Sequence, residues 1–233
     1  LGPAVMTFRL GEESSVGRNS RLLLANGMIY WVGALDDVVR PTGPFDPELP
    51  VWAFRRPDGS LEALLFNHST HTIGARTPGV RSPGFYGLAA QELEKDLGGT
   101  ALFFEGASGS THNLDLKADE MTLRVKNAVR DALAKAEPRP VDRVRGLRKE
   151  VVVKVRDFDE AREDAAVMAY EAHKVKDANA ARFVAGVFRD MRRELAPKRG
   201  EERKTWVQAI RIGEFAIVGA PAEFFTTLGQ DVK

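Results

Sequence analysis

A strand–helix–strand order in the first half of the chain constrains its fold more than any other feature. Leu61–Phe66 is a short apolar run typical of a buried strand, and Phe85–Leu97 has a helical pattern that ends at Gly98-Gly99. Ala101–Phe104 follows as a second apolar strand. Strands joined through a helix form a βαβ-like unit, so the loops that follow them gather at one edge of the sheet. This order predicts an α/β fold.

Turn signals add hairpins to this unit. Asn-Gly tolerates positive φ at both residues, and Pro, Asp and Gly favour tight turns, so apolar runs on either side of such residues read as paired strands. Three turns of this kind are Asn26-Gly27, Arg56-Pro57-Asp58-Gly59 and Gly213-Glu214. The segment from Pro41 to Pro50 is rich in Pro, Gly and Asp, which predicts a loop. We therefore expect a mixed β-sheet flanked by helices.

The second half of the chain is mainly helical in pattern. Ala118–Ala136 is a predicted helix that stops before Pro138, and Val151–Val155 is a predicted strand. Asp157–Leu195 is long, charged and helical, with a predicted break near Asp177–Asn179. Its charge is typical of a solvated helical face.

Composition excludes several classes of function. The 34 basic and 33 acidic residues give a net charge of +1, which provides no electrostatic basis for binding nucleic acid. No apolar run is long enough to predict a transmembrane segment. Without cysteine, thiol nucleophiles and zinc–thiolate sites are excluded. The chain begins Leu-Gly-Pro without a signal-like segment, so we expect an excised or processed piece, and secreted, periplasmic and cytoplasmic locations all stay open.

Two of the four histidines, His68 and His71, follow directly after the first strand of the βαβ-like unit. Residues i and i+3 of a strand point to opposite faces, so both can serve one centre only if the strand has already given way to a loop. Imidazole is a common metal ligand and the usual general base near neutral pH. Each histidine is therefore either a site residue or a hydrogen-bonded structural residue.

The segment Glu105–Asn113 follows the second strand of the unit. Gly106 and Gly109 let its backbone turn tightly and approach a ligand closely. Ser110 and His112 are too close in sequence to indicate a triad, and the segment lacks the Gly-Lys-Ser/Thr ending of a P-loop. It is either a polar turn after a buried strand or part of a site.

Glu223 lies between Pro221 and the pair Phe224-Phe225. Apolar neighbours make a carboxylate costly to desolvate, and a metal ion or a paired cation would offset that cost. Glu223 is thus a third candidate for a site residue.

Taken in order, these segments resemble the neutral/alkaline (non-lysosomal) ceramidase family and its bacterial relatives. The stretch N-H-S-T-H-T is similar to the family's N-F-A-x-H-P, in a register that places His71, not His68, on the metal-binding histidine. The run T-A-L-F-F-E-G-A-S-G-S-T-H-N is similar to the segment that contains the family's G-A-A-G-D loop. G-A-P-A-E-F-F is similar to the family's P-G-E-F segment, whose glutamate corresponds to Glu223.

The resemblance implies a zinc-dependent amide hydrolase. In the family, zinc is bound by two histidines, a glutamate and a tyrosine, polarises an amide carbonyl and activates the attacking group, so that an N-acyl sphingoid base is hydrolysed. His71 and Glu223 are then the expected Zn²⁺ ligands, and His112 is a candidate for acid–base work or substrate contact. The implied substrate is a small-molecule or lipid amide.

The resemblance also implies that residues 1–233 are the central and C-terminal part of a ceramidase-like catalytic domain. The other two zinc ligands would lie in upstream and downstream portions, in the same precursor or in a second chain.

Several positions depart from the family pattern. Ser110 stands where the loop aspartate belongs, His112 where the ceramidases carry a proposed catalytic serine, and Ala222 where the last motif has glycine. Arg81 stands where many relatives have an acidic residue. These departures leave two alternatives open: a hydrolase of a different small amide or peptide on the same scaffold, and a non-catalytic binding relative with a degenerate metal site.

Overall fold

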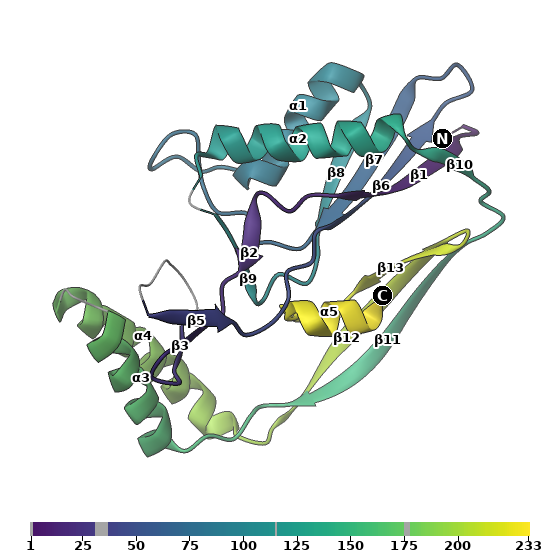
Figure 1. Cartoon of the computed structure of the whole chain (residues 1–233). Coiled ribbons are helices and arrows are strands. Elements are labelled where there is room, and N and C mark those ends of the chain that lie inside the picture. Colours follow the sequence, from purple (N-terminus) through teal and green to yellow (C-terminus); the bar gives the residue numbers. More distant parts are fainter. Residues whose placement is uncertain (1, 31–36, 115, 175–177) are drawn as a thin grey trace. The chain divides into compact units, whose positions relative to one another are not determined.

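The computed structural model describes residues 2–30, 37–114, 116–174 and 178–233, and the chain divides into two units (Figure 1). The first unit comprises Leu1–Arg145, Arg211–Ala216 and Ala222–Lys233, and the second comprises Gly146–Ile210 and Ile217–Pro221.

The first unit contains most of the strands. In chain order they are β1 (Val5–Glu12), β2 (Gly17–Asn19), β3 (Leu22–Leu24), β4 (Ile29–Tyr30), β5 (Val38–Pro41), β6 (Glu48–Arg55), β7 (Leu61–His68), β8 (Thr100–Glu105), β9 (Thr111–Asn113) and β10 (Glu137–Arg139). Its helices are α1 (Gly84–Leu97), α2 (Ala118–Ala134) and α5 (Thr226–Val232).

The main sheet has the order β10-β1-β6-β7-β8. Its β1–β10, β1–β6 and β6–β7 pairs are antiparallel, whereas β7 and β8 are parallel and are joined through α1. Figure 1 shows α1 and α2 packed against one face of this sheet. The predicted mixed sheet with flanking helices and the predicted βαβ-like unit are therefore confirmed.

The hydrophobic core lies between the sheet and these two helices. Leu64 and Phe66 of β7 alternate with outward-facing neighbours, as the two-residue period of a strand requires. Met121, Val125 and Val129 recur every fourth residue of α2, so they form one buried stripe. Burial of this apolar face stabilises both helices against the sheet.

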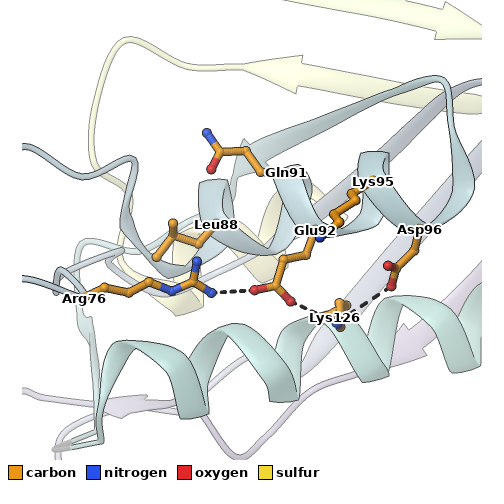
Figure 2. Close-up of a pocket in the computed structure, with 7 residues that line it drawn as sticks. All are labelled: Arg76, Leu88, Gln91, Glu92, Lys95, Asp96 and Lys126. Carbon is orange, nitrogen blue, oxygen red and sulfur yellow. Dashed lines mark hydrogen bonds and ion pairs between the residues drawn. The ribbon is translucent and has the colours of Figure 1, made fainter.

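An ion-pair network joins the polar sides of α1 and α2 (Figure 2). Lys126 of α2 donates to Glu92 of α1 at 2.8 Å and lies 3.7 Å from Asp96. Arg76, from the loop before α1, pairs with Glu92 as well. The charges compensate one another, and these contacts tie the loop after β7 to both helices.

The hairpin predictions are confirmed at all three turns, but several bounds differ. The predicted loop Pro41–Pro50 contains the end of β5 and the start of β6, because β1 continues its pairing to Glu48. Trp31 and Val32, expected in the strand after Asn26-Gly27, lie outside the described residues. The strands β2, β5, β9 and β10 were not predicted, since they are only three or four residues long and, unlike β3, do not flank one of the turn signals.

The second unit is built on a helical pair. Its elements are α3 (Glu160–Lys174), α4 (Ala178–Leu195) and the short 3₁₀ helix η1 (Ala196–Lys198). The sheet β11-β12-β13 consists of β11 (Val144–Lys154), β12 (Glu202–Ile212) and β13 (Phe215–Gly219), and one end of each strand belongs to the first unit. The strand β11 begins earlier than the predicted Val151. The two helices agree with the predicted pair, although part of the predicted break lies outside the described residues.

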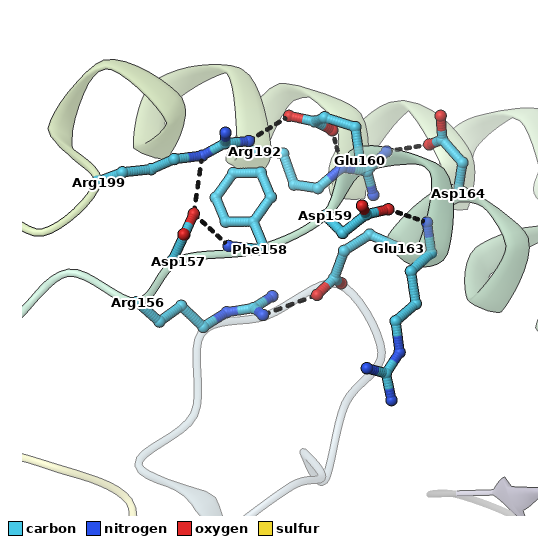
Figure 3. Close-up of polar contacts among 10 residues, drawn as sticks. Arg156, Asp157, Phe158, Asp159, Glu160, Glu163, Asp164, Arg192 and Arg199 are labelled. Carbon is cyan, nitrogen blue, oxygen red and sulfur yellow. Dashed lines mark hydrogen bonds and ion pairs between the residues drawn. The ribbon is translucent and has the colours of Figure 1, made fainter.

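Buried Arg192 holds the helical pair together (Figure 3). It donates from α4 to Glu160 of α3 at 3.0 Å and also pairs with Asp164. Arg199 reaches the same Glu160 and covers the ring of Phe158.

Within the described residues, no helix has the length and apolar content needed to cross a bilayer.

Candidate metal and catalytic site

The parallel strands β7 and β8 end side by side, and their loops then run together. His68 lies opposite Glu105 in the register of the two strands, and the Gly106 N–H donates to the His68 carbonyl at 2.9 Å. A Cβ on Gly106 would come within 2.3 Å of the Ser69 hydroxyl, so a larger residue there would require the Ser69 side chain to shift. The predicted gathering of polar loops at one sheet edge is present.

His68 is a structural residue. Its side chain is fully buried, its Nδ1 faces the Tyr86 hydroxyl, and its Nε2 lies 2.8 Å from the Glu13 carbonyl. A carbonyl only accepts, so Nε2 carries the hydrogen and Nδ1 of the neutral ring accepts from Tyr86. Burial lowers the pKa of His68 and raises the pKa of Tyr86 well above its ordinary value.

His71 lies beyond the end of β7, in the loop, where its direction is no longer fixed by the strand. Its Nε2 is 3.9 Å from Oε2 of Glu223, on the segment that leads into α5. The His71 side chain is 31% exposed and that of Glu223 is 79% exposed. Within the described part of the chain, the buried Nδ1 of His71 has no hydrogen-bond partner.

His112 lies beside His71. The two imidazole rings are nearly parallel, at 17°, with centroids 6.0 Å apart. His112 belongs to β9, opposite Arg18 of β2, and its Nδ1 is 3.3 Å from the Asn113 carbonyl. The structure thus brings together the three residues that the ceramidase resemblance implies as site residues: His71, His112 and Glu223.

Arg21 is a nearby residue that sequence reasoning did not single out. Its Nη2 donates to the Gly109 carbonyl at 3.0 Å, and its guanidinium lies 5.1 Å from the Phe225 ring centre. Burial lowers the pKa of Arg21, and the negative charge of Glu223 opposes that shift. An arginine after a short strand carries no signal in the sequence that would have assigned it to this site.

The donor atoms present fit part of a zinc site. Two ligands at about 2 Å from a tetrahedral zinc ion lie about 3.3 Å from each other. The His71 and Glu223 atoms are 3.9 Å apart, so they would have to approach each other slightly to share one ion. Imidazole nitrogen and carboxylate oxygen are both ordinary zinc ligands. Among the described residues, however, no group of three histidine, cysteine, aspartate or glutamate side chains is arranged to hold a metal ion.

Comparison with known proteins gives structural matches only. No protein-family model matches the chain, and no curated protein has a significant match to it. The chain is similar to the crystal structure of neutral ceramidase from Pseudomonas aeruginosa, with a TM-score of 0.65 and 18% identity, over 99% of this chain and 42% of that one. It is also similar to a ceramidase complexed with C2, with a TM-score of 0.62 and 15% identity, over 99% of this chain and 43% of that one.

These matches confirm the predicted ceramidase-like fold. They also establish that the chain spans less than half of the length of either solved structure.

Proposed function

We propose that this chain carries part of the active site of a zinc-dependent amide hydrolase of the ceramidase type. The observation that supports this most directly is the 3.9 Å separation between Nε2 of His71 and Oε2 of Glu223. The two residues come from separate loops of a fold similar to that of neutral ceramidase. Further ligands would come from outside the chain, in the same precursor or in a second chain.

The proposed roles follow from the chemistry of the side chains. Bound zinc would supply Lewis acidity that polarises an amide carbonyl and activates the attacking group. His71 and Glu223 would hold the ion with one nitrogen and one oxygen ligand. His112, whose ring faces that of His71, would accept or donate a proton at a ring nitrogen during amide cleavage.

Apolar side chains near these residues support an N-acyl amide as the substrate. Ile73 and Phe225 each lie two residues from a proposed ligand, and they are 48% and 47% exposed. Exposed apolar surface beside a polar centre suits a substrate with an acyl chain.

The test is a zinc titration and activity assay of the full-length protein. We expect His71→Ala and Glu223→Ala each to weaken zinc binding by about 100-fold or more and to abolish hydrolysis of a long-chain N-acyl amine. Glu201→Ala, at an exposed loop position, is the matched control and is expected to behave like the parent protein. Zinc binding that neither substitution weakens would refute the proposal.

A different amide substrate is the second candidate. His112 stands where the ceramidases carry a proposed catalytic serine. This difference favours a substrate other than an N-acyl sphingoid base. Assays with short polar amides and peptides beside long-chain N-acyl amines distinguish the two. A third outcome, no metal in the intact protein, would favour a non-catalytic binding relative.

A further inference from the structure

The segment that carries Glu223 contacts a turn that is far away in the sequence. It lies between β13 and α5, where the chain is irregular, and its side chain is largely exposed. The adjacent residue, Phe224, has its carbonyl bonded to the Gly109 N–H at 2.9 Å. Gly109 belongs to the turn between β8 and β9, far away in the sequence.

The approach of the two segments leaves no space for a side chain. A Cβ on Gly109 would lie 2.3 Å from the Glu223 carbonyl oxygen and 2.9 Å from its carbonyl carbon. Both are backbone atoms, which cannot move aside without displacing Glu223 itself. A residue with a side chain therefore cannot replace Gly109 without displacing the backbone of Glu223.

Ser110 caps the helix that follows Glu223. Phe225 precedes α5 and offers no side-chain acceptor, and the Ser110 hydroxyl instead accepts a hydrogen bond from the Thr226 N–H at 2.9 Å. The Thr226 hydroxyl is 3.0 Å from the same oxygen, and both side chains are buried. The Ser110 carbonyl in turn accepts from the Ser20 N–H at 2.9 Å, which anchors the turn.

We propose that Gly109 and Ser110 form a positioning element for Glu223, with Ser110 acting as a helix cap. An aspartate at position 110, as in the family's motif, would also present an acceptor oxygen, since serine and aspartate side chains both accept hydrogen bonds from N–H groups at a helix start. The inference rests on the proposed function in one respect only, namely that the group bound by Glu223 is a zinc ion.

The first test is hydrogen exchange in the full chain. Ser110→Ala removes the cap, so amide exchange in residues 223–230 should accelerate about fivefold, while exchange in β7 stays unchanged. Ser110→Asp should restore the parent rate. Unchanged exchange in Ser110→Ala, or acceleration that extends through the core, would overturn the inference.

Glycine substitutions provide a second, independent variant. Gly109→Ala should accelerate exchange in the same segment because its Cβ meets the Glu223 backbone. Gly146→Ala is the matched control, since a Cβ there meets no atom within 4 Å. Equal behaviour of these two variants would count against the positioning role.

Zinc affinity is the final readout. In the full-length protein, Ser110→Ala should weaken Zn²⁺ binding about 10- to 100-fold, Ser110→Asp should restore it, and Ser110→Ala should add nothing in a Glu223→Gln background. Parent-like affinity in Ser110→Ala would overturn the inference. If the parent protein binds no zinc, the proposed function fails, and the exchange data alone then decide whether the turn positions Glu223.

Discussion

The Tyr86 hydroxyl donates to Nδ1 of His68 and thereby links the first turns of α1 to the end of β7. The other ring nitrogen of His68 is bonded to the Glu13 carbonyl. The ring is thus fixed in one tautomer, and the strand from which His71 emerges is held on both sides.

His68→Ala should be strongly destabilising. The substitution leaves a cavity and leaves the buried Tyr86 hydroxyl and Glu13 carbonyl without their partner, which together cost about 3 kcal/mol. His71→Ala, at a part-exposed loop position, should cost less than about 1 kcal/mol. Urea denaturation of both variants checks this difference, and equal losses would contradict it.

Stability should decrease with acidification through His68. Burial lowers its pKa in the folded protein, so below about pH 6.5 the unfolded chain binds more protons than the folded one. The stability contributed by the neutral ring is complete above this pH and is lost as the pH falls toward the folded pKa. Unfolding free energies between about pH 7 and about pH 5 should fall more steeply for the parent protein than for His68→Gln. Identical slopes would show that His68 is not the group responsible.

Gly84→Ala should destabilise the junction between α1 and the His71 loop. Gly84 has φ +67°, and a Cβ there would lie 2.8 Å from the Thr72 carbonyl oxygen. Strain and overlap together should cost about 3 kcal/mol. Gly59→Ala has a similar positive φ of +85° but meets no atom, so it should cost about 1 kcal/mol. Thermal unfolding of the two variants measures both losses of stability. Their difference is the cost of the steric overlap at Gly84, because both positions share a positive φ.

His112→Asn should separate proton transfer from metal binding. If His112 acts in acid–base catalysis, kcat should fall about 100-fold or more while zinc affinity stays within about threefold of the parent value. Steady-state kinetics and zinc titration of the full-length protein measure both quantities. A large loss of zinc affinity would instead make His112 a ligand.

Arg192→Ala should loosen the pair α3 and α4. Its side chain is 5% exposed and pairs with Glu160 and Asp164, so its removal should cost about 2 kcal/mol. Arg193→Ala, whose side chain is 73% exposed, should change stability by less than about 0.5 kcal/mol. Proteolysis rates within residues 160–195 of the two variants test this contrast.

Most of the main sheet, apart from β10, and its two helices are predictable because their signals are local. Leu61–Phe66 and Ala101–Phe104 are apolar runs of strand length, and Gly98-Gly99 ends the helix between them. By contrast, Gly17–Asn19 and Thr111–Asn113 become strands only because each meets the other. Such pairing over a long sequence distance leaves no local pattern.

Only part of the candidate site could be predicted from the sequence. A loop after a strand predicted that His71 could turn toward a centre, and the ceramidase resemblance separated it from His68. The contact between Ser110 and Thr226 joins segments far apart in the chain, and neither residue type indicates it. The place of Arg21 in the site could not be predicted either, because the Gly109 acceptor is a backbone carbonyl, which any residue type would provide.

The pairing of β1 has a consequence for synthesis of the chain. One edge of β1 can pair with β6 once Glu48–Arg55 has been made, but the other edge is covered only by β10, at Glu137–Arg139. Until these residues leave the ribosome, β1 presents unpaired N–H and C=O groups that other strands can bind. The late strand is short and contains Pro138, which has no N–H to offer a further partner. The second edge of β1 therefore stays open until β10 has been made, and the finished sheet ends there at a short strand that contains a proline.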